Sequence, residues 1–446
     1  MTTESPDDVG EAPAGAPVAM VLHSQGYLRL LLVAAVLGIP LSVTAFGFLV
    51  GVHELEHVVW HSLPHELGYD RVPAWWPIPA LGLAGVLVAL AVLHLPGHGG
   101  HVPADGLGAG ATPPSHVPGV LLGAGASLVL GAVVGPEAPL IALGSGLALL
   151  AVRRTKAADS VQISAVVAAS GSAAAISAIL GNPLIAAVLL VEVLGLARRQ
   201  TLLVVLPCLV SSGIGALVFT GLGSWTGLKI GALAIPDLGS TRLQVAEVGW
   251  AVPVAAVVGV LTWLVFFLGR RTAALAKERV VAVTVGAGLL AGGSATAYAL
   301  VTGHSSAEVA LSGQATLPLL AAEPEAWSTG ALLALLVCKG LAYALSIGVF
   351  RGGPVFPAIF LGAAIGVVAS TWLPGLGLVP ALAIGMAAGM AVTGLPVTSV
   401  VLVVLLLGDA AASQMPVVIL ATVTALVVEE LLRSRGTHAP EYDHVG

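Results

Sequence analysis

Apolar segments separated by short polar ones make up most of the chain. The first, Leu28 to Val52, is about 25 residues long, which is enough to cross a bilayer and too long for the core of a signal peptide. Gly or Pro interrupts many later segments before they reach the roughly 20 residues that a spanning helix needs. These later segments cover approximately residues 77–95, 117–134, 140–152, 161–180, 183–197, 201–222, 246–269, 280–301, 330–350, 355–372, 377–393, 396–407 and 415–432.

Short, interrupted segments predict helices that break inside the protein. Lipid offers no water to free backbone N–H and C=O groups, so such breaks persist only beside protein or a cavity. We therefore expect an all-α polytopic membrane protein with many tilted, broken helices. Residues 1–24 are acidic and rich in Pro, Gly and Ala, which predicts a disordered N-terminal tail. Residues 434–446 form a short C-terminal tail.

Composition supports a membrane protein and argues against a soluble domain or a nucleic-acid-binding protein. Hydrophobic residues make up 57% of the 446 residues and charged residues 9%, against roughly 25% charge in soluble domains. The net charge of −6 gives no basic surface for nucleic acid. Cys208 and Cys338 lie in apolar stretches and predict neither a disulfide nor a metal site. The expected surroundings are the lipid bilayer of a cell membrane, crossed several times, with no cofactor.

Basic residues gather at the ends of several apolar segments. The positive-inside rule assigns these ends, and the C-terminus with them, to the cytoplasm, and the polar stretch at 223–245 to the outside. The clusters are Arg153, Arg154 and Lys156; Arg198 and Arg199; Arg270, Arg271, Lys277 and Arg279; and Arg433 and Arg435.

Two pairs of similar sequences divide the chain into halves. GPEAPLIALG (135–144) and GPVFPAIFLG (353–362) share six of ten residues at an offset of 218. GNPLIAAVLLVEVLG (181–195) and GLPVTSVVLVVLLLG (394–408) share seven of fifteen at an offset of 213. Because apolar matches are common in an apolar chain, the Gly and Pro positions carry the argument.

These matches predict two membrane repeats, residues 28–222 and 243–433. The segment after Gly135 ends in RRTK, whereas the segment after Gly353 ends in TWLP, which has no cation. Equivalent helices that leave on opposite sides of the membrane make an inverted repeat. The alternative is a shared way of starting helices without common ancestry.

Each copy places Gly and Pro directly before an apolar helix, which suits anion binding. The free N–H groups at a helix start form the positive end of its dipole. Two such ends that meet in the middle of the bilayer make an anion site without a formal positive charge. Partial charges bind weakly enough for the ion to leave.

Glu137 stands in the first copy where the second has Val355. A carboxylate within a membrane segment is costly and is therefore a functional candidate. At a helix start it would occupy the anion's own place until a proton releases it, which predicts a pH-sensitive gate. The alternative is a Glu that caps its own helix.

These residues resemble the ClC family of chloride channels and chloride/proton exchangers over residues 28 to 433. VGPEAP resembles the family's G-[K/R]-E-G-P motif, which implies that Glu137 is the gating residue. CKGLAYALSIGVFRGGPVFPAIFLGAAIG, from Cys338 to Gly366, is similar to the region whose backbone amides bind the anion. The resemblance implies an inverted-repeat ClC-type fold, a homodimer with one pore per subunit, cytoplasmic termini and chloride transport rather than catalysis. Within the family, the chain resembles a divergent bacterial-type member without cytoplasmic regulatory domains.

The chain departs from the family pattern at the anion site. The first filter motif, G-S-G-I-P, is matched only by GHGGHVP, which puts either Gly100 or His98 at the position of the Ser that touches the central anion. His98 and His101 are therefore either donors to the ion or loop histidines near a membrane surface. The family's inner-gate tyrosine has no counterpart in 415–432, so fluoride or another small anion stays open as the substrate.

Proline limits the backbone donors at both helix starts. Pro136 and Pro354 have no N–H, so the donors left in the second half are Val355 and Phe356. The expected anion-binding residues are Val355, Phe356, Gly353, Gly100, His98, His101 and Gly135.

A second carboxylate decides between exchange and passive conduction. Family exchangers pass protons inward through a Glu near the end of the helix in PLIAAVLLVEVLG, and the alignment puts Val193 there, with Glu192 one place earlier. One residue turns a helical side chain by about 100°, so Glu192 is not a direct replacement. Val193 resembles the channel branch and favours channel-like conduction. Proton-coupled exchange, with Glu192 and Val193 on the internal proton path, stays open.

HELEH, from His53 to His57, matches the H-E-x-x-H of zinc metalloproteases. An intramembrane protease would need a third ligand, for which Asp105 is the candidate. However, Asp105 lies in a stretch whose spacing to Glu137 suits the anion filter. We therefore expect the polar face of a helix that leaves the membrane, continued by His61, and no metal site. The other rival is an unrelated secondary transporter with inverted repeats.

Overall fold

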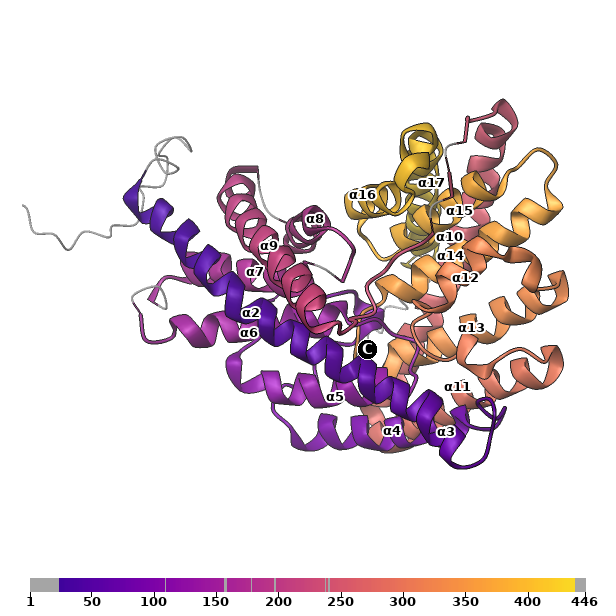
Figure 1. Ribbon diagram of the computed structural model, residues 1–446, viewed down its shortest axis with the longest axis horizontal. Coiled ribbons are helices and arrows are strands. Elements are labelled where there is room, and N and C mark those ends of the chain that lie inside the picture. The colour runs from indigo at the N-terminus through magenta and orange to yellow at the C-terminus, as the bar shows by residue number, and fades with distance from the viewer. Residues whose placement is uncertain are drawn as a thin grey trace, which may run out of the picture.

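The structure is a computed structural model that describes residues 24–108, 110–155, 159–177, 179–195, 198–236, 238–239 and 241–437 (Figure 1). The tails predicted at 1–24 and 434–446 lie outside these residues, apart from Ser24 and 434–437. Within the described ranges the regular structure is helical, without strands. The α-helices are α2 (Gln25–His57), α3 (Leu63–Glu66), α4 (Pro77–His94), α5 (Val117–Val129), α6 (Glu137–Val152), α7 (Val161–Ile176), α8 (Pro183–Leu194), α9 (Arg198–Thr226), α10 (Val245–Glu278), α11 (Val280–Thr302), α12 (Thr316–Ala322), α13 (Thr329–Val349), α14 (Val355–Trp372), α15 (Leu378–Ala391), α16 (Pro396–Leu406) and α17 (Ala411–Thr437).

Helix lengths confirm the predicted polytopic fold with broken helices. Eight helical stretches of the described chain are long and apolar enough to cross a membrane, whereas α6, α7, α8, α15 and α16 are apolar but shorter. The segment predicted at 117–134 remains α-helical only to Val129. The chain turns at Gly131, whose positive φ of 95° suits a residue without a Cβ, and then runs toward the start of α6.

The helix contacts of one half repeat those of the other. α6 packs on α7 as α14 packs on α15, and α9 packs on α2 and α7 as α17 packs on α10 and α15. A Cβ added at Gly144 would collide with the backbone of Gly171, and one at Gly362 with the backbone of Gly385. Small residues let membrane helices approach this closely. These matching contacts support the division into two repeats that we propose from the sequence.

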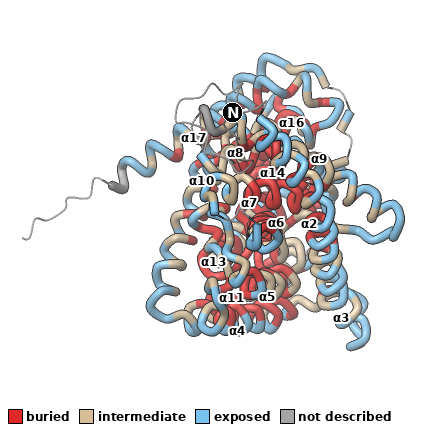
Figure 2. Tube along the Cα trace, turned by 90° about the vertical axis from the view of Figure 1, so that its left-hand side faces the viewer, coloured by how far each residue is buried: buried red, intermediate tan, exposed pale blue. Residues whose placement is uncertain are grey.

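The core lies where the two halves meet. α14 is buried from Val355 to Val368, and α6 is buried from Glu137 to Ile141. Figure 2 shows the buried residues gathered around α6, α7 and α14, with exposed residues on the outer helices. The starts of the two short helices therefore lie at the centre of the molecule, and apolar side chains on the outside suit lipid.

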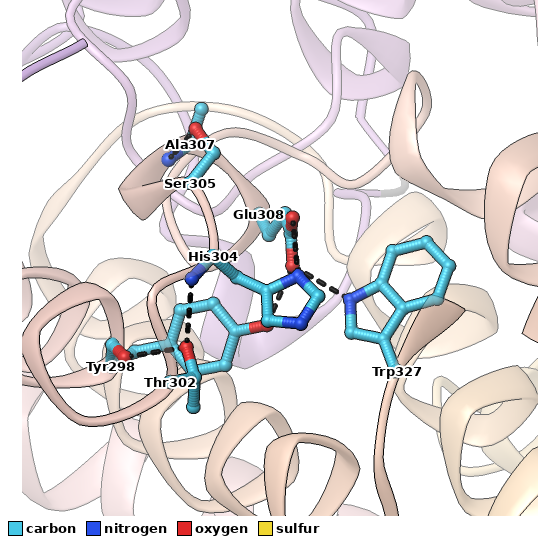
Figure 3. Close-up of polar contacts among 7 residues, drawn as sticks. All are labelled: Tyr298, Thr302, His304, Ser305, Ala307, Glu308 and Trp327. Atoms are coloured by element: carbon cyan, nitrogen blue, oxygen red, sulfur yellow. Dashed lines mark hydrogen bonds and ion pairs between the residues drawn. The ribbon is translucent and has the colours of Figure 1, made fainter. Parts of the chain in front are cut away.

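A polar cluster in the second half centres on Glu308, at the end of the 3₁₀ turn Ser306–Glu308 (Figure 3). Glu308 Oε2 accepts hydrogen bonds from the Tyr298 hydroxyl at 2.6 Å and from Trp327 Nε1 at 2.8 Å. Its Oε1 lies 3.4 Å from His304 Nδ1. The cluster joins the end of α11 to the segment before α13.

Lys339 of α13 ties the same loop to the core. Its ammonium nitrogen lies 2.8–3.3 Å from four successive backbone carbonyls, from Glu308 to Leu311, which share its three N–H donors. It also lies 4.6 Å from the centre of the Phe360 ring. Leu311 N–H in turn donates to Gly131 O at 2.9 Å. The loop thus holds the second half against the segment that leads from α5 to α6.

Candidate functional site

Two equivalent glycines bind each other where the halves meet. Gly135 N–H donates to Gly353 O at 2.7 Å, and Gly353 N–H donates to Gly135 O at 2.6 Å. The two segments run antiparallel at this bridge, and the residues are separated by the offset of 218 that the sequence repeat gives. A reciprocal, antiparallel pair of equivalent residues places a local two-fold axis between them. α6 and α14 each begin two residues later, one on either side of this axis.

Glu137 reaches across this axis to the start of the other helix. Its Oε1 accepts hydrogen bonds from Val355 N–H at 2.7 Å and from Phe356 N–H at 3.2 Å. Glu137 is fully buried, and its Oε2 has no hydrogen-bond partner among the described residues. A Cβ added at Gly135 or Gly353 would collide with this carboxylate. The two glycines therefore provide the space that the carboxylate fills.

The carboxylate occupies the place that a helix start offers to an anion. The free N–H groups of α14 converge on one acceptor, and the positive end of the helix dipole favours a negative charge there. Glu137 thus caps the opposite helix rather than only the helix that it begins. Val355 and Phe356, the donors expected from the sequence, are the two residues that bind it.

Two residues of α13 that the sequence analysis missed support the surrounding backbone. The Tyr343 hydroxyl donates to Pro354 O at 2.6 Å. Ser346 Oγ accepts a hydrogen bond from Val133 N–H at 3.1 Å. Because residues three apart share a helix face, two hydroxyls at this spacing in an apolar helix were the signal that could have found them.

The segment matched to the first filter motif forms no α-helix start. Gly100 and His101 line a cavity next to the site, whereas His98 Nδ1 lies 3.0 Å from Val92 O and the ring does not line the cavity. The His98 carbonyl accepts a hydrogen bond from Arg351 Nε at 3.2 Å. This segment of the first half therefore contributes loop backbone and the His101 ring, and its His98 carbonyl binds a guanidinium that comes from Arg351 of the second half.

Glu192 lies at the start of α16, the helix equivalent to its own. Its Oε1 accepts from Val397 N–H at 2.7 Å. Its Oε2 accepts from Thr398 N–H at 2.8 Å and from the Thr398 hydroxyl at 2.6 Å. Val193, the next residue, is half-buried against apolar side chains. The structure gives Glu192 the geometry of a helix cap.

The H-E-x-x-H stretch lies at the end of α2. The rings of His57 and His61 stack with their centres 5.0 Å apart, across the π-helical turn Val58–Ser62. Asp105 belongs to the 3₁₀ turn Pro103–Asp105, which packs on α10 and α13. Among the described residues, no three His, Cys, Asp or Glu side chains are close enough to hold a metal ion.

Comparison with known proteins identifies the family. The family model described as "Voltage gated chloride channel" matches residues 104–430. The chain belongs to this family. Relatives of this ClC chain include proteins named "Putative ion-transport protein YfeO". The one from Escherichia coli O7:K1 (strain IAI39 / ExPEC) is 27% identical over 362 residues, which cover 79% of the chain and 82% of the relative.

Solved ClC structures share the fold. A slow cyanobacterial Cl⁻/H⁺ antiporter matches with a TM-score of 0.69 at 18% identity, covering 91% of this chain and 95% of the other. A CLC-type fluoride/proton antiporter matches with a TM-score of 0.66 at 16% identity, covering 91% and 96%. At such identities the likeness shows the fold alone, and it confirms the predicted ClC-type architecture. Family membership supports anion transport as the activity.

Proposed function

We propose that this ClC protein conducts chloride through its pore and that Glu137 is the gate. The observation that carries the proposal is the docked carboxylate: Glu137 Oε1 binds the N–H groups of Val355 and Phe356, which would otherwise hold the ion. Carboxylate and chloride compete for one place. Occupation by the carboxylate closes the pore.

Protonation releases the gate. A proton on Glu137 removes its negative charge and leaves a weaker acceptor for the two N–H groups. Chloride then takes the vacated place and is held by partial charges alone, so that it also leaves readily. Conduction should therefore rise as pH falls.

The surroundings of Glu192, the second carboxylate, favour passive conduction over proton-coupled exchange. Glu192 accepts three hydrogen bonds at the start of α16, which suits a structural cap, and Val193 cannot carry a proton. The alternative is proton-coupled exchange, the activity named for the cyanobacterial antiporter of similar fold. Fluoride selectivity is the second alternative, named for another structure of similar fold.

We also propose a homodimer with one pore per subunit, repeats at 28–222 and 243–433, and cytoplasmic termini in the cell membrane. Exposed apolar residues on α8, α9 and α16 suit a lipid-embedded interface between two copies. They include Leu184, Leu202, Leu206 and Val397.

Chloride efflux from liposomes with simultaneous pH recording tests the function. The wild type should release chloride without stoichiometric proton movement, and its efflux should rise by up to about tenfold per pH unit of acidification while the gate is mostly deprotonated. Glu137→Gln should conduct independently of pH, at or above the acidic wild-type rate. Glu325→Gln, at an exposed position, should retain the wild-type pH response.

Each contrary result has a defined meaning. An unchanged pH response in Glu137→Gln would exclude Glu137 as the gate. Uphill proton movement driven by chloride in the wild type would replace passive conduction by exchange. Faster efflux in fluoride than in chloride would assign fluoride as the preferred anion.

A further inference from the structure

A tyrosine hydroxyl lies directly behind the start of the helix that receives Glu137. The Tyr343 hydroxyl on α13 donates to Pro354 O at 2.6 Å. Pro354 directly precedes α14, and its carbonyl belongs to the same peptide group as Val355 N–H. The C=O and N–H of a trans peptide point in opposite directions. The hydroxyl therefore binds one end of this peptide group, while the Glu137 carboxylate binds the other end at 2.7 Å.

The Pro354 carbonyl does not depend on this hydroxyl for a partner. It also accepts the first hydrogen bond within α14, from Ala358 N–H at 3.3 Å. Pro136, the equivalent residue before α6, accepts the same helical bond from Leu140 N–H at 3.1 Å. Within the described ranges, no side chain donates to the Pro136 carbonyl. The start of α14 therefore has a hydrogen bond that the start of α6 lacks.

One residue of the repeat accounts for this difference. Ser346 Oγ on α13 accepts a backbone N–H hydrogen bond from the segment before α6 at 3.1 Å, and Ser127 Oγ on α5 accepts one from the segment before α14 at 3.0 Å. These reciprocal contacts make the two serines equivalent. Tyr343 stands three residues before Ser346, and Ala124 stands three residues before Ser127. The hydroxyl is thus found behind the helix start that receives the carboxylate, and its counterpart in the first half has none.

Burial makes this chain of hydrogen bonds effective. Tyr343 is fully buried, and its ring packs edge-on against Phe266 of α10 with the ring centres 6.0 Å apart. Neither Tyr343 nor Glu137 forms an ion pair with any described residue. In a buried site of low dielectric, a donor on a carbonyl polarises the peptide group and strengthens its N–H as a donor. In agreement, Glu137 Oε1 lies closer to Val355 N, at 2.7 Å, than to Phe356 N, at 3.2 Å.

We propose that Tyr343 is a positioning residue of the gate, whose hydroxyl strengthens Val355 N–H as the donor for both occupants of the helix start. These occupants are the Glu137 carboxylate and the small anion that replaces it, so the inference rests on the proposed function. Tyr343 touches neither of them and acts through the peptide group between Pro354 and Val355. It therefore stabilises the closed gate and the bound ion alike.

Calorimetric titration with chloride tests the inference in the Glu137→Gln protein, in which no carboxylate competes with the ion. Adding Tyr343→Phe retains the ring and removes the hydroxyl. Chloride should then bind about two- to fivefold more weakly, because about 10–30% of the strength of one charge-assisted hydrogen bond is lost. Tyr27→Phe is the matched control, since it removes a hydroxyl that donates to another backbone carbonyl, Leu203 O at 3.3 Å. It should leave the chloride affinity of Glu137→Gln unchanged.

The pH dependence of efflux gives a readout that a loss of packing would not produce. With Glu137 in place, Tyr343→Phe weakens the docking of both the carboxylate and chloride. At low chloride the carboxylate competes with an empty site, so the pH of half-maximal efflux should rise by roughly 0.3–0.7 unit, the logarithm of the same factor. At saturating chloride the two losses cancel, and the shift should disappear.

A ring-fluorinated tyrosine at position 343 tests the opposite direction and serves if Tyr343→Phe fails to fold. Its hydroxyl is a stronger donor of almost unchanged size, so chloride should bind more tightly and the pH of half-maximal efflux at low chloride should fall. Unchanged chloride affinity and pH response in both Tyr343 variants would overturn the proposal, as would a shift of both variants in the same direction.

Failure of the gate has a different signature. A pH response that persists in Glu137→Gln, together with weaker chloride binding after Tyr343→Phe, would contradict the gate alone. Efflux of Glu137→Gln that is independent of pH, together with unchanged chloride binding after Tyr343→Phe, would contradict the role of Tyr343 alone.

Discussion

Gly135 and Gly353 belong to the proposed gate as much as Glu137 does, because the carboxylate fills the space that a side chain would need at either position. Each glycine also gives one N–H and one carbonyl to the bridge. At the residue scale the site therefore consists of one acidic side chain, two backbone N–H donors and two glycines, whose lack of a side chain leaves room for the carboxylate.

Gly353→Ala should lower chloride flux and stability. The added methyl takes the place of the carboxylate, which in the proposed gate is also the place of the ion, and such overpacking costs about 1–3 kcal/mol. Gly47→Ala in α2 is the matched control, because a Cβ there meets nothing within 4 Å, and it should leave flux unchanged. Liposome efflux and thermal unfolding in detergent measure both effects. Wild-type flux in Gly353→Ala would mean that the ion does not pass this point.

Sequence alone pointed to the residues that the structure brings together in the proposed gate, but not to their contacts. The repeated Gly and Pro positions led to Glu137, Val355 and Phe356, because backbone donors at a helix start follow from local sequence. The repeat does not say that the carboxylate crosses to α14, since that contact joins residues 218 apart. Arg351 escaped notice for a related reason: its Nε binds the His98 carbonyl, and most of the cavity beside it is lined by residues of the other half of the chain.

At the scale of elements, one carboxylate joins two equivalent helices. Glu192 on α8 binds the start of α16 through three hydrogen bonds. Helices that lack a cap leave N–H groups without partners, and lipid makes this more costly. The contact therefore fixes α16 relative to α8.

Glu192→Ala should destabilise the protein by about 1–2 kcal/mol, the usual cost of losing an N-terminal cap, without changing the ratio of protons to chloride. Thermal unfolding in detergent and the liposome assay measure the two effects. Glu430→Ala removes an exposed carboxylate on α17 and should change neither. Unaltered stability combined with loss of proton movement would make Glu192 part of a proton path instead.

Helix positions were predictable from sequence where apolar segments had Gly or Pro at their ends. α14, predicted at 355–372, begins and ends at those residues. The end of α5 was not predictable, because the apolar residues from Leu130 to Val134 leave the helix to reach the bridge of the two halves. Hydrogen bonds to distant parts of the chain set the end of α5, and the pattern of apolar residues gives no sign of such bonds.

At the scale of the whole molecule, the antiparallel bridge requires that α6 and α14 leave the centre in opposite directions. α6 ends at Val152, before the exposed Arg153 and Arg154, whereas α14 ends at Trp372. The positive-inside rule then predicts that the end of α6 lies on the cytoplasmic side.

Thiol labelling in cells tests this orientation. In a chain with Cys208 and Cys338 replaced by Ala, the Trp372→Cys variant should react with a membrane-impermeant reagent in intact cells. The Arg154→Cys variant should react only after permeabilisation. The cysteine-free chain is the control and should not react. Labelling of both variants from one side would contradict the inverted orientation.

The bridge between Gly135 and Gly353 also sets an order of synthesis. When the first half leaves the ribosome, the N–H groups that receive Glu137 have not yet been made, because they belong to residues 355 and 356. The Glu137 carboxylate and the backbone groups of Gly135 therefore stay without their partners until more than two hundred further residues have been synthesised. A chain truncated before α14 therefore leaves the Glu137 carboxylate and the backbone groups of Gly135 without their partners in the membrane, which is energetically costly. Membrane quality control could recognise these unpaired groups, which the finished protein does not expose.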